Sequence, residues 1–213
     1  MDKFLRKIST LLVYLFLICN SILVLGPVIW TIMASFKKGN NLFSSTFSGI
    51  EFTFDHYITL FTDTPYMQWY LNTFILATAN MLISLFVVTM TAYVFSRYRF
   101  RGKRNTLMSI LVLQMFPAFL SMTAIYILLS KANLIDTYTG LLLVYVTGSL
   151  PFMTWLVKGY FDAIPTSLDE AAKIDGAGHL TIFIQIILPL AKPILVFVGL
   201  VSFTGPWMDF ILP

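Results

Sequence analysis

The residues whose types and spacing are most informative lie in a polar segment, 159–179, between two long apolar stretches. Ser167 and Glu170 have the S-x-x-E spacing of a capping box, in which two side chains bond the first amide groups of a helix. Asp169 lies beside Glu170 in the same first turn, where the helix dipole favours negative charge. Gly176 can end the helix in a left-handed conformation. The pattern predicts a short helix.

The helix covers residues 167–175 in this prediction, fewer than the roughly 12–15 residues at which an isolated helix becomes marginal. It must therefore be held by packing. One face carries the residues at the i, i+3, i+4 and i+7 positions: Leu168, Ala171, Ala172 and Asp175. The two alanines leave a low surface that the backbone of another chain could approach closely. Two alternatives stay open, a helix that binds a soluble partner and a helix that lies on the membrane surface without one.

Patterns for catalysis and metal binding are absent from the sequence. The two histidines, His56 and His179, lie far apart in the chain, and Cys19 is the only cysteine. The sequence contains no H-E-x-x-H, no G-x-S-x-G and no G-x-x-x-x-G-K-[ST] phosphate-binding loop. We therefore predict that the chain is not an enzyme and that it holds no metal of its own.

The elements that position the segment follow from composition. Of 213 residues, 58% are hydrophobic and 11% are charged, whereas ordinary soluble domains contain about 25% charged residues. This is too little polar surface for a soluble globule. Five apolar stretches reach the length of about 20 residues that a membrane-spanning helix requires: 11–33, 70–96, 107–129, 139–158 and 190–211. We predict an all-α membrane protein, a polytopic transmembrane helix bundle. The first apolar run exceeds the roughly 7–15 residues of a signal-peptide core, so we expect it to be retained.

The basic residues predict the orientation. Eleven of the 14 precede the first span, join the second to the third, or join the fourth to the fifth. The positive-inside rule then places the N-terminus and the helix 167–175 in the cytoplasm of a multi-pass protein of the cell membrane. Five spans leave the C-terminus outside, and Pro213 follows the last apolar run without a polar tail. We expect an incomplete chain, and a complete five-span protein is the alternative.

Polar residues within the spans have two interpretations. Singly, such groups form interhelical hydrogen bonds that contribute about 0.6 kcal/mol each. As a set, they are candidates to line a pathway for a polar solute: Asn72, Asn80, Gln114, Thr147 and Ser149. The span interiors hold no Lys, Arg or Glu. That argues against a proton relay or a voltage sensor, which need ionisable side chains inside the membrane.

The segment resembles the membrane subunits of ABC importers, whose cytoplasmic pattern is E-A-A-x3-G-x9-I-x-L-P. Here the pattern runs Glu170-Ala171-Ala172, Gly176 and Ile186-Ile187-Leu188-Pro189. Two further runs resemble the carbohydrate-uptake branch, near its maltose/maltodextrin permeases: Gln114-Met115-Phe116-Pro117 and Trp207-Met208-Asp209-Phe210. The resemblance covers residues 66–213, which we take as the core of a single transmembrane domain, 1–213, with a coupling segment at 159–190.

The resemblance implies a coupled mechanism. The short helix would dock in a groove on a dimeric cytoplasmic ATPase, which would bind ATP and Mg, so that this chain carries no cofactor. Glu170 would contact a basic or polar group there. The residues of this docking surface would be Ser167, Asp169, Glu170, Ala171, Ala172, Asp175, Gly176 and Ala177. Closure of the ATPase would drive alternating access.

The resemblance also implies partners. A second permease subunit, usually a different chain, would complete the pathway, and an extracellular solute-binding protein would deliver the carbohydrate. Family members generally have a sixth span and a cytoplasmic tail, which this sequence lacks. Nucleic acid is not among the expected partners. The runner-up interpretation is a stand-alone secondary carrier or channel for a polar solute.

Overall fold

The computed structural model describes residues 2–39, 52–115 and 117–212. Phe116, in one of the runs that carry the family resemblance, lies outside the described residues. Over these ranges the regular elements are helices, with one isolated antiparallel bridge between Lys37 and Phe52. The predicted all-α class is confirmed. The chain divides into two units, Met1–Trp69 and Tyr70–Pro213.

The first unit contains two complete helices, α1 (Asp2–Ser35) and α2 (Asp55–Thr62), and the beginning of α3. The α1 helix contains the predicted span 11–33, and its apolar side chains are exposed along its length. The Ser35 and Tyr57 hydroxyl oxygens lie 2.7 Å apart. The ring of Tyr57 packs on that of Phe36, with centroids 5.3 Å apart. These contacts hold the start of α2 against the end of α1.

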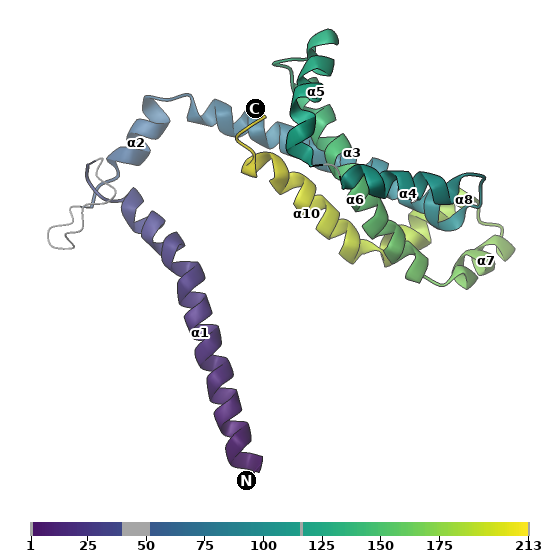
Figure 1. The fold of residues 1–213 in the computed structure, drawn as a ribbon, viewed down its shortest axis with the longest axis horizontal. Coiled ribbons are helices and arrows are strands. Elements are labelled where there is room, and N and C mark those ends of the chain that lie inside the picture. The colour runs from purple at the N-terminus through teal and green to yellow at the C-terminus, as the bar shows by residue number, and fades with distance from the viewer. Residues whose placement is uncertain (1, 40–51, 116, 213) are drawn as a thin grey trace. The chain divides into compact units, whose positions relative to one another are not determined.

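The second unit is built on three long helices, α3 (Tyr66–Arg97), α6 (Tyr138–Ala163) and α10 (Lys192–Met208). The α6 helix packs against both α10 and α4 (Lys103–Gln114). Figure 1 shows α7 (Thr166–Ile174) at one end of this unit, beside α8 (His179–Ile182). A five-residue π-helix, η1 (Phe183–Ile187), and the short α9 (Leu188–Leu190) lead from α8 to α10.

Three helices are long and apolar enough to cross a membrane in the described ranges: α1 from Arg6, α3 and α6. They contain the predicted spans 11–33, 70–96 and 139–158. A fourth is reached if His179–Leu190 and Lys192–Met208, which meet at 81°, count as one bent span. The predicted span 190–211 therefore begins at this bend, and its helix ends at Met208.

The predicted span 107–129 is not one helix in the structure, and it is not among the helices long and apolar enough to cross a membrane in the described ranges. The α4 helix ends at Gln114, and a separate helix, α5 (Ala118–Lys131), begins after Pro117. Proline has no amide hydrogen and disfavours the helical conformation of the residue before it. Pro117 itself has φ −59° and ψ 123°, an extended conformation that directs the chain out of α4.

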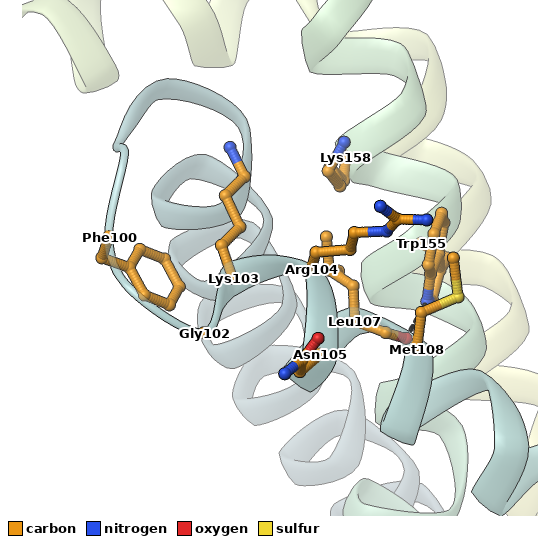
Figure 2. Close-up of a pocket in the computed structure, with 9 residues that line it drawn as sticks. All are labelled: Phe100, Gly102, Lys103, Arg104, Asn105, Leu107, Met108, Trp155 and Lys158. Carbon is orange, nitrogen blue, oxygen red and sulfur yellow. Dashed lines mark hydrogen bonds between the residues drawn. The ribbon is translucent and has the colours of Figure 1, made fainter.

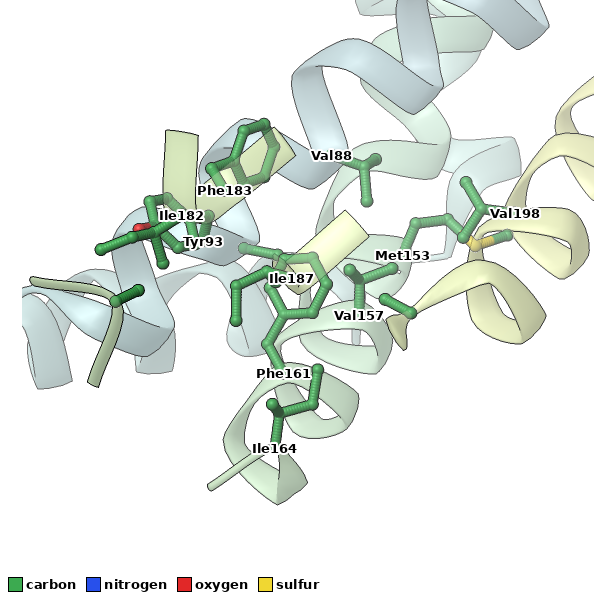
Figure 3. Packing of buried hydrophobic residues seen from close by; sticks show 13 residues of the cluster. Val88, Tyr93, Met153, Val157, Phe161, Ile164, Ile182, Phe183, Ile187 and Val198 are labelled. Atoms are coloured by element: carbon green, nitrogen blue, oxygen red, sulfur yellow. The ribbon is translucent and has the colours of Figure 1, made fainter. Parts of the chain in front are cut away.

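The buried core of the second unit lies where α3, α6, η1 and α10 meet. Side chains with no exposed surface come from each of them: Val88, Val157, Phe161, Ile187 and Val198. Figure 3 shows these side chains directed toward one another. Ala172 of α7 belongs to the same cluster. The core therefore extends to the segment that carries the sequence pattern, which supplies the packing that a short helix requires.

Candidate functional site

The α7 helix begins one residue earlier than predicted. Pro165 occupies the N-cap position, and the structure shows no side-chain hydrogen bond at this cap. The capping-box prediction for Ser167 and Glu170 is therefore wrong. Proline at the cap sets an extended φ and ψ that leads straight into Thr166, so Ser167 already lies inside the first turn.

The α7 helix ends at Ile174, one residue before the predicted end, and the left-handed conformation predicted for Gly176 is confirmed. Gly176 has φ +83°, in the left-handed region. Its amide donates to the Lys173 carbonyl at 3.0 Å, and the amide of Ala177 donates to the Ala172 carbonyl at 2.9 Å. These two bonds form a Schellman motif, which satisfies carbonyls that the helix end would leave unpaired. The turn reverses the chain and directs it back toward α8.

The faces of α7 differ from the prediction in one respect. Ala172 and Asp169 are buried against the rest of the unit, and Ala177 is half-buried. The remaining residues of the predicted docking surface are exposed: Ser167, Glu170, Ala171, Asp175 and Gly176. Ala172 is thus on the buried side with Asp169, which lies 60° from it around the helix at 100° per residue, whereas Ala171 is 100° away from Ala172 on the outer face.

Ile174 is a residue of this face that the sequence reasoning missed. Its side chain has 87% of its surface exposed, although isoleucine is among the residues most often buried. It lies one turn after Ala171, on the side of α7 opposite Asp169 and Ala172. Once Asp169 and Ala172 are known to be buried, an apolar residue three positions after Ala171 is expected on the opposite, exposed face.

Arg97 is a second missed residue, and it fastens α7 to the membrane helices. Its Nε lies 2.7 Å from Asp169 Oδ2, and the two side chains are only 8% and 9% exposed. Arg97 Nη1 donates to the Phe161 carbonyl at 2.9 Å, and Nη2 donates to the Ile164 carbonyl at 3.0 Å. These carbonyls belong to the end of α6, which leaves such groups without intrahelical partners. One guanidinium therefore joins the ends of α3 and α6 to α7.

A further set of contacts holds the chain on both sides of α7. The Ser96 hydroxyl donates to Asp162 Oδ1 at 2.7 Å, on the approach to α7. The Tyr93 hydroxyl donates to the His179 carbonyl at 3.4 Å, just after it. Because Tyr93 and Ser96 both belong to the last turns of α3, these bonds join that helix to the chain on both sides of α7.

The polar residues proposed for a pathway do not form one site. Asn80 is buried, and its Nδ2 donates to the Ser202 carbonyl of α10 at 2.6 Å. Thr147 and Ser149 donate to carbonyls of their own helix, α6, at 2.6 Å and 3.1 Å. Gln114 is exposed at the end of α4. The observed bonds of these residues are thus interhelical or local.

Asn72 is the exception among the five. It lines a cavity of about 630 Å³ together with polar residues from α3 and from the turn that leads into α6: Thr73, Asp136, Thr137 and Tyr138. The volume is within the usual range of small-molecule sites, about 300–1,000 Å³. Asn72 and Arg97 lie near opposite ends of α3, a rise of about 37 Å at 1.5 Å per residue. The cavity and α7 are therefore at opposite ends of the second unit.

Comparison with known proteins found a matching family model and several similar sequences. Residues 89–213 match the family model described as binding-protein-dependent transport system inner membrane component. The maltodextrin transport system permease protein MdxG of Bacillus subtilis is 42% identical over 97% of this chain and 74% of its own length. The galactooligosaccharides transport system permease protein GanQ of the same organism is 44% identical, with the same two coverages.

A solved structure is also similar to this chain. It is a bacterial ABC transporter involved in the import of the acidic polysaccharide alginate, with a TM-score of 0.85 and 25% sequence identity. The match covers 96% of this chain and 72% of that one. The maltose/maltodextrin permease MalG of Vibrio parahaemolyticus is 33% identical over 85% of this chain and 67% of its own length.

Proposed function

Since the chain belongs to the family of binding-protein-dependent transport system inner membrane components, we propose that it is the permease subunit of an ATP-driven importer of oligosaccharides. Relatives named for maltodextrin and for galactooligosaccharides are 42% and 44% identical to it. The proposed substrates are therefore oligosaccharides, and maltodextrin is the first sugar to test. The solute would pass by alternating access through a pathway shared with a second permease subunit.

The observation that carries the proposal is the division of α7 into two faces. Asp169 and Ala172 anchor it, while Glu170, Ala171 and Ile174 are exposed on the other side. An isoleucine with 87% of its surface exposed is a natural anchor for a pocket on a partner. The partner would be the cytoplasmic ATPase dimer, with Ile174 in an apolar pocket and Glu170 facing a basic group.

The mechanism divides chemistry and movement between the chains. The ATPase would hold ATP and Mg and hydrolyse the nucleotide, and this chain would be non-catalytic and free of cofactors. Closure of the ATPase would displace α7. Through Arg97 the displacement would reach the ends of α3 and α6 together, which suits a rigid-body rocking of the helices.

The sugar side of the mechanism lies at the other end of α3. An extracellular solute-binding protein would deliver the oligosaccharide near the cavity lined by Asn72, Asp136 and Tyr138. Amide, carboxylate and phenol groups are the kinds that hydrogen-bond sugar hydroxyls. This arrangement requires the N-terminus and α7 on the cytoplasmic side, as the basic residues predict.

The test is assembly and transport in reconstituted vesicles. Ile174→Asp should prevent co-purification of the ATPase and abolish maltodextrin uptake. With Glu170→Ala, the ATPase of the complex should still hydrolyse ATP, but maltodextrin uptake should be reduced. Ile58→Asp is the matched control, because Ile58 is also an exposed isoleucine but lies in α2. It should leave assembly intact.

The competing function, a stand-alone secondary carrier or channel, predicts a different result. The chain alone, in liposomes with an ion gradient and without ATPase, would then take up the solute. Such uptake would refute the importer, as would full ATPase binding by the Ile174→Asp protein.

A further inference from the structure

A basic pocket of about 450 Å³ lies between the start of α4 and α6, away from the outer face of α7. Lys103 and Arg104 come from the first turn of α4, and Lys158 comes from α6 (Figure 2). Figure 2 shows the Arg104 side chain extending from α4 toward α6, where Trp155 and Lys158 lie. No acidic side chain lines the pocket in the part of the chain that the structure describes.

Two of the three cations have no acidic partner in the described ranges. Lys158 forms an ion pair with Asp162, one turn further along α6. Lys103 Nζ donates to the Tyr98 carbonyl at 3.1 Å, which is an uncharged partner. The Arg104 side chain has no hydrogen bond or ion pair with any residue in the described ranges. One carboxylate thus pairs with one of the three cations, and the other two keep their charge, so the pocket is suited to an anion.

An apolar groove continues from this pocket along α4. It has a volume of about 490 Å³ and shares Asn105 and Met108 with the pocket. Beyond them it is lined by Val112 and Leu113, whose side chains are exposed. The stretch of α4 from Lys103 to Leu113 rises about 15 Å, which is half of a hydrocarbon core about 30 Å thick. The groove therefore matches the depth of one leaflet.

We propose that this pocket and groove bind one anionic phospholipid. Its phosphate would lie among Lys103, Arg104 and Lys158, and an acyl chain would follow α4 past Met108. A free phosphate could bind the basic side chains, but it has no apolar part that would occupy the groove. Trp155, whose Nε1 donates to the Leu107 carbonyl at 3.2 Å, supplies the aromatic ring typical of the headgroup region.

The proposal rests on the chain being a membrane-spanning permease, but it does not require α7 to dock on an ATPase. If the predicted orientation holds, the lipid lies in the cytoplasmic leaflet, where anionic lipids attract basic residues close to the membrane. The site would hold the start of α4 and the facing part of α6 together in that leaflet.

The test is native mass spectrometry of the purified full chain in detergent, titrated with dioleoyl phosphatidylglycerol or dioleoyl phosphatidylcholine. We expect one phosphatidylglycerol to bind more tightly than phosphatidylcholine. Arg104→Gln combined with Lys158→Gln should weaken phosphatidylglycerol about 25-fold, because each basic residue near a membrane surface contributes about fivefold. Arg104→Lys keeps the charge and should retain binding.

The matched control removes two charges outside the pocket, with Arg6→Gln and Lys7→Gln on exposed positions of α1. It should leave the affinity unchanged. Equal binding of the two lipids, or equal losses in the control and the pocket variant, would overturn the proposal. Displacement of phosphatidylglycerol by millimolar inorganic phosphate would assign the pocket to a soluble anion instead of a lipid. Loss of ATPase binding in the Ile174→Asp protein bears only on the proposed function.

Discussion

The buried ion pair between Arg97 and Asp169 makes the stability of α7 depend on a single carboxylate. We predict that Asp169→Asn loosens α7 from the ends of α3 and α6 without affecting membrane insertion. The substitution keeps the shape of the side chain and removes its charge, so it isolates the electrostatic contribution. The Arg97 guanidinium would remain buried beside a neutral group.

The size of the effect follows from the burial of the pair. Both side chains are less than 10% exposed, with an Nε–Oδ2 distance of 2.7 Å. Removing one partner of such a pair costs about 3–5 kcal/mol, because the other charge is left buried without compensation. The asparagine oxygen can still accept from the charged Arg97, a bond worth about 1.5 kcal/mol. We therefore expect a loss of about 1.5–3.5 kcal/mol, which corresponds to a population of opened α7 raised about 12- to 300-fold.

The assay is amide hydrogen exchange of the purified chain without partners, followed at the amides of α7. Opening of α7 from its docked position should accelerate exchange there by the factor given above, while the interior of α3 stays protected. Glu170→Gln is the matched control. It removes the same charge from the next residue of the same helix, but Glu170 is exposed, so we expect a change below about 0.5 kcal/mol.

Two results would refute the reasoning. Exchange in the Asp169→Asn protein at the wild-type rate would show that the pair contributes nothing to the position of α7. Equal acceleration in both variants would assign the effect to the helix dipole, which acts on every charge in the first turn. A cycle with Arg97→Met provides an independent check, since the two substitutions must be non-additive if the side chains interact.

Three further predictions concern backbone and interhelical contacts. Gly176→Ala should destabilise the end of α7 by about 1–2 kcal/mol, because φ is +83° there, whereas Gly178→Ala, at φ −73°, should not; hydrogen exchange of the turn amides compares them. Gly140→Ala should lower the melting temperature, since its Cβ would lie 2.1 Å from a backbone oxygen, and Gly148→Ala, with nothing within 4 Å, is the control on the same helix. Asn80→Leu should cost about 0.6–1.7 kcal/mol in thermal unfolding through its bond to α10 and leave uptake per folded complex unchanged; lost uptake at unchanged stability would contradict this.

Properties that depend on neighbours in the chain could be read from the sequence. The spans at 11–33, 70–96 and 139–158 were found because twenty apolar residues need a helix in a membrane, whatever they pack against. The left-handed end of α7 was found because Gly176 lacks the Cβ that opposes a positive φ. The family pattern could likewise be recognised because it depends only on the order and spacing of residues along the chain.

Two errors came from patterns that allow more than one outcome. A proline within an apolar run can kink a membrane helix or break it, and at Pro117 the helix is broken. The S-x-x-E spacing allowed a helix start at Ser167, but Pro165 already holds the N-cap position. Asn80 likewise suited a pathway or an interhelical bond, and its 2.6 Å bond to Ser202 is interhelical.

Hydropathy, charge and motif order by themselves thus determined that this is an all-α membrane protein of the ABC importer permease kind, with a short helix followed by a left-handed turn at Gly176. They gave no means of separating Asp169 from Glu170, two adjacent acids in one turn. Only the tertiary structure decided that Asp169 faces Arg97 inside the protein while Glu170 and Ile174 remain exposed for a partner. The physical reason is that the partner of a side chain depends on how distant helices pack, and the ends of α3 and α6 meet α7 only when the chain has folded.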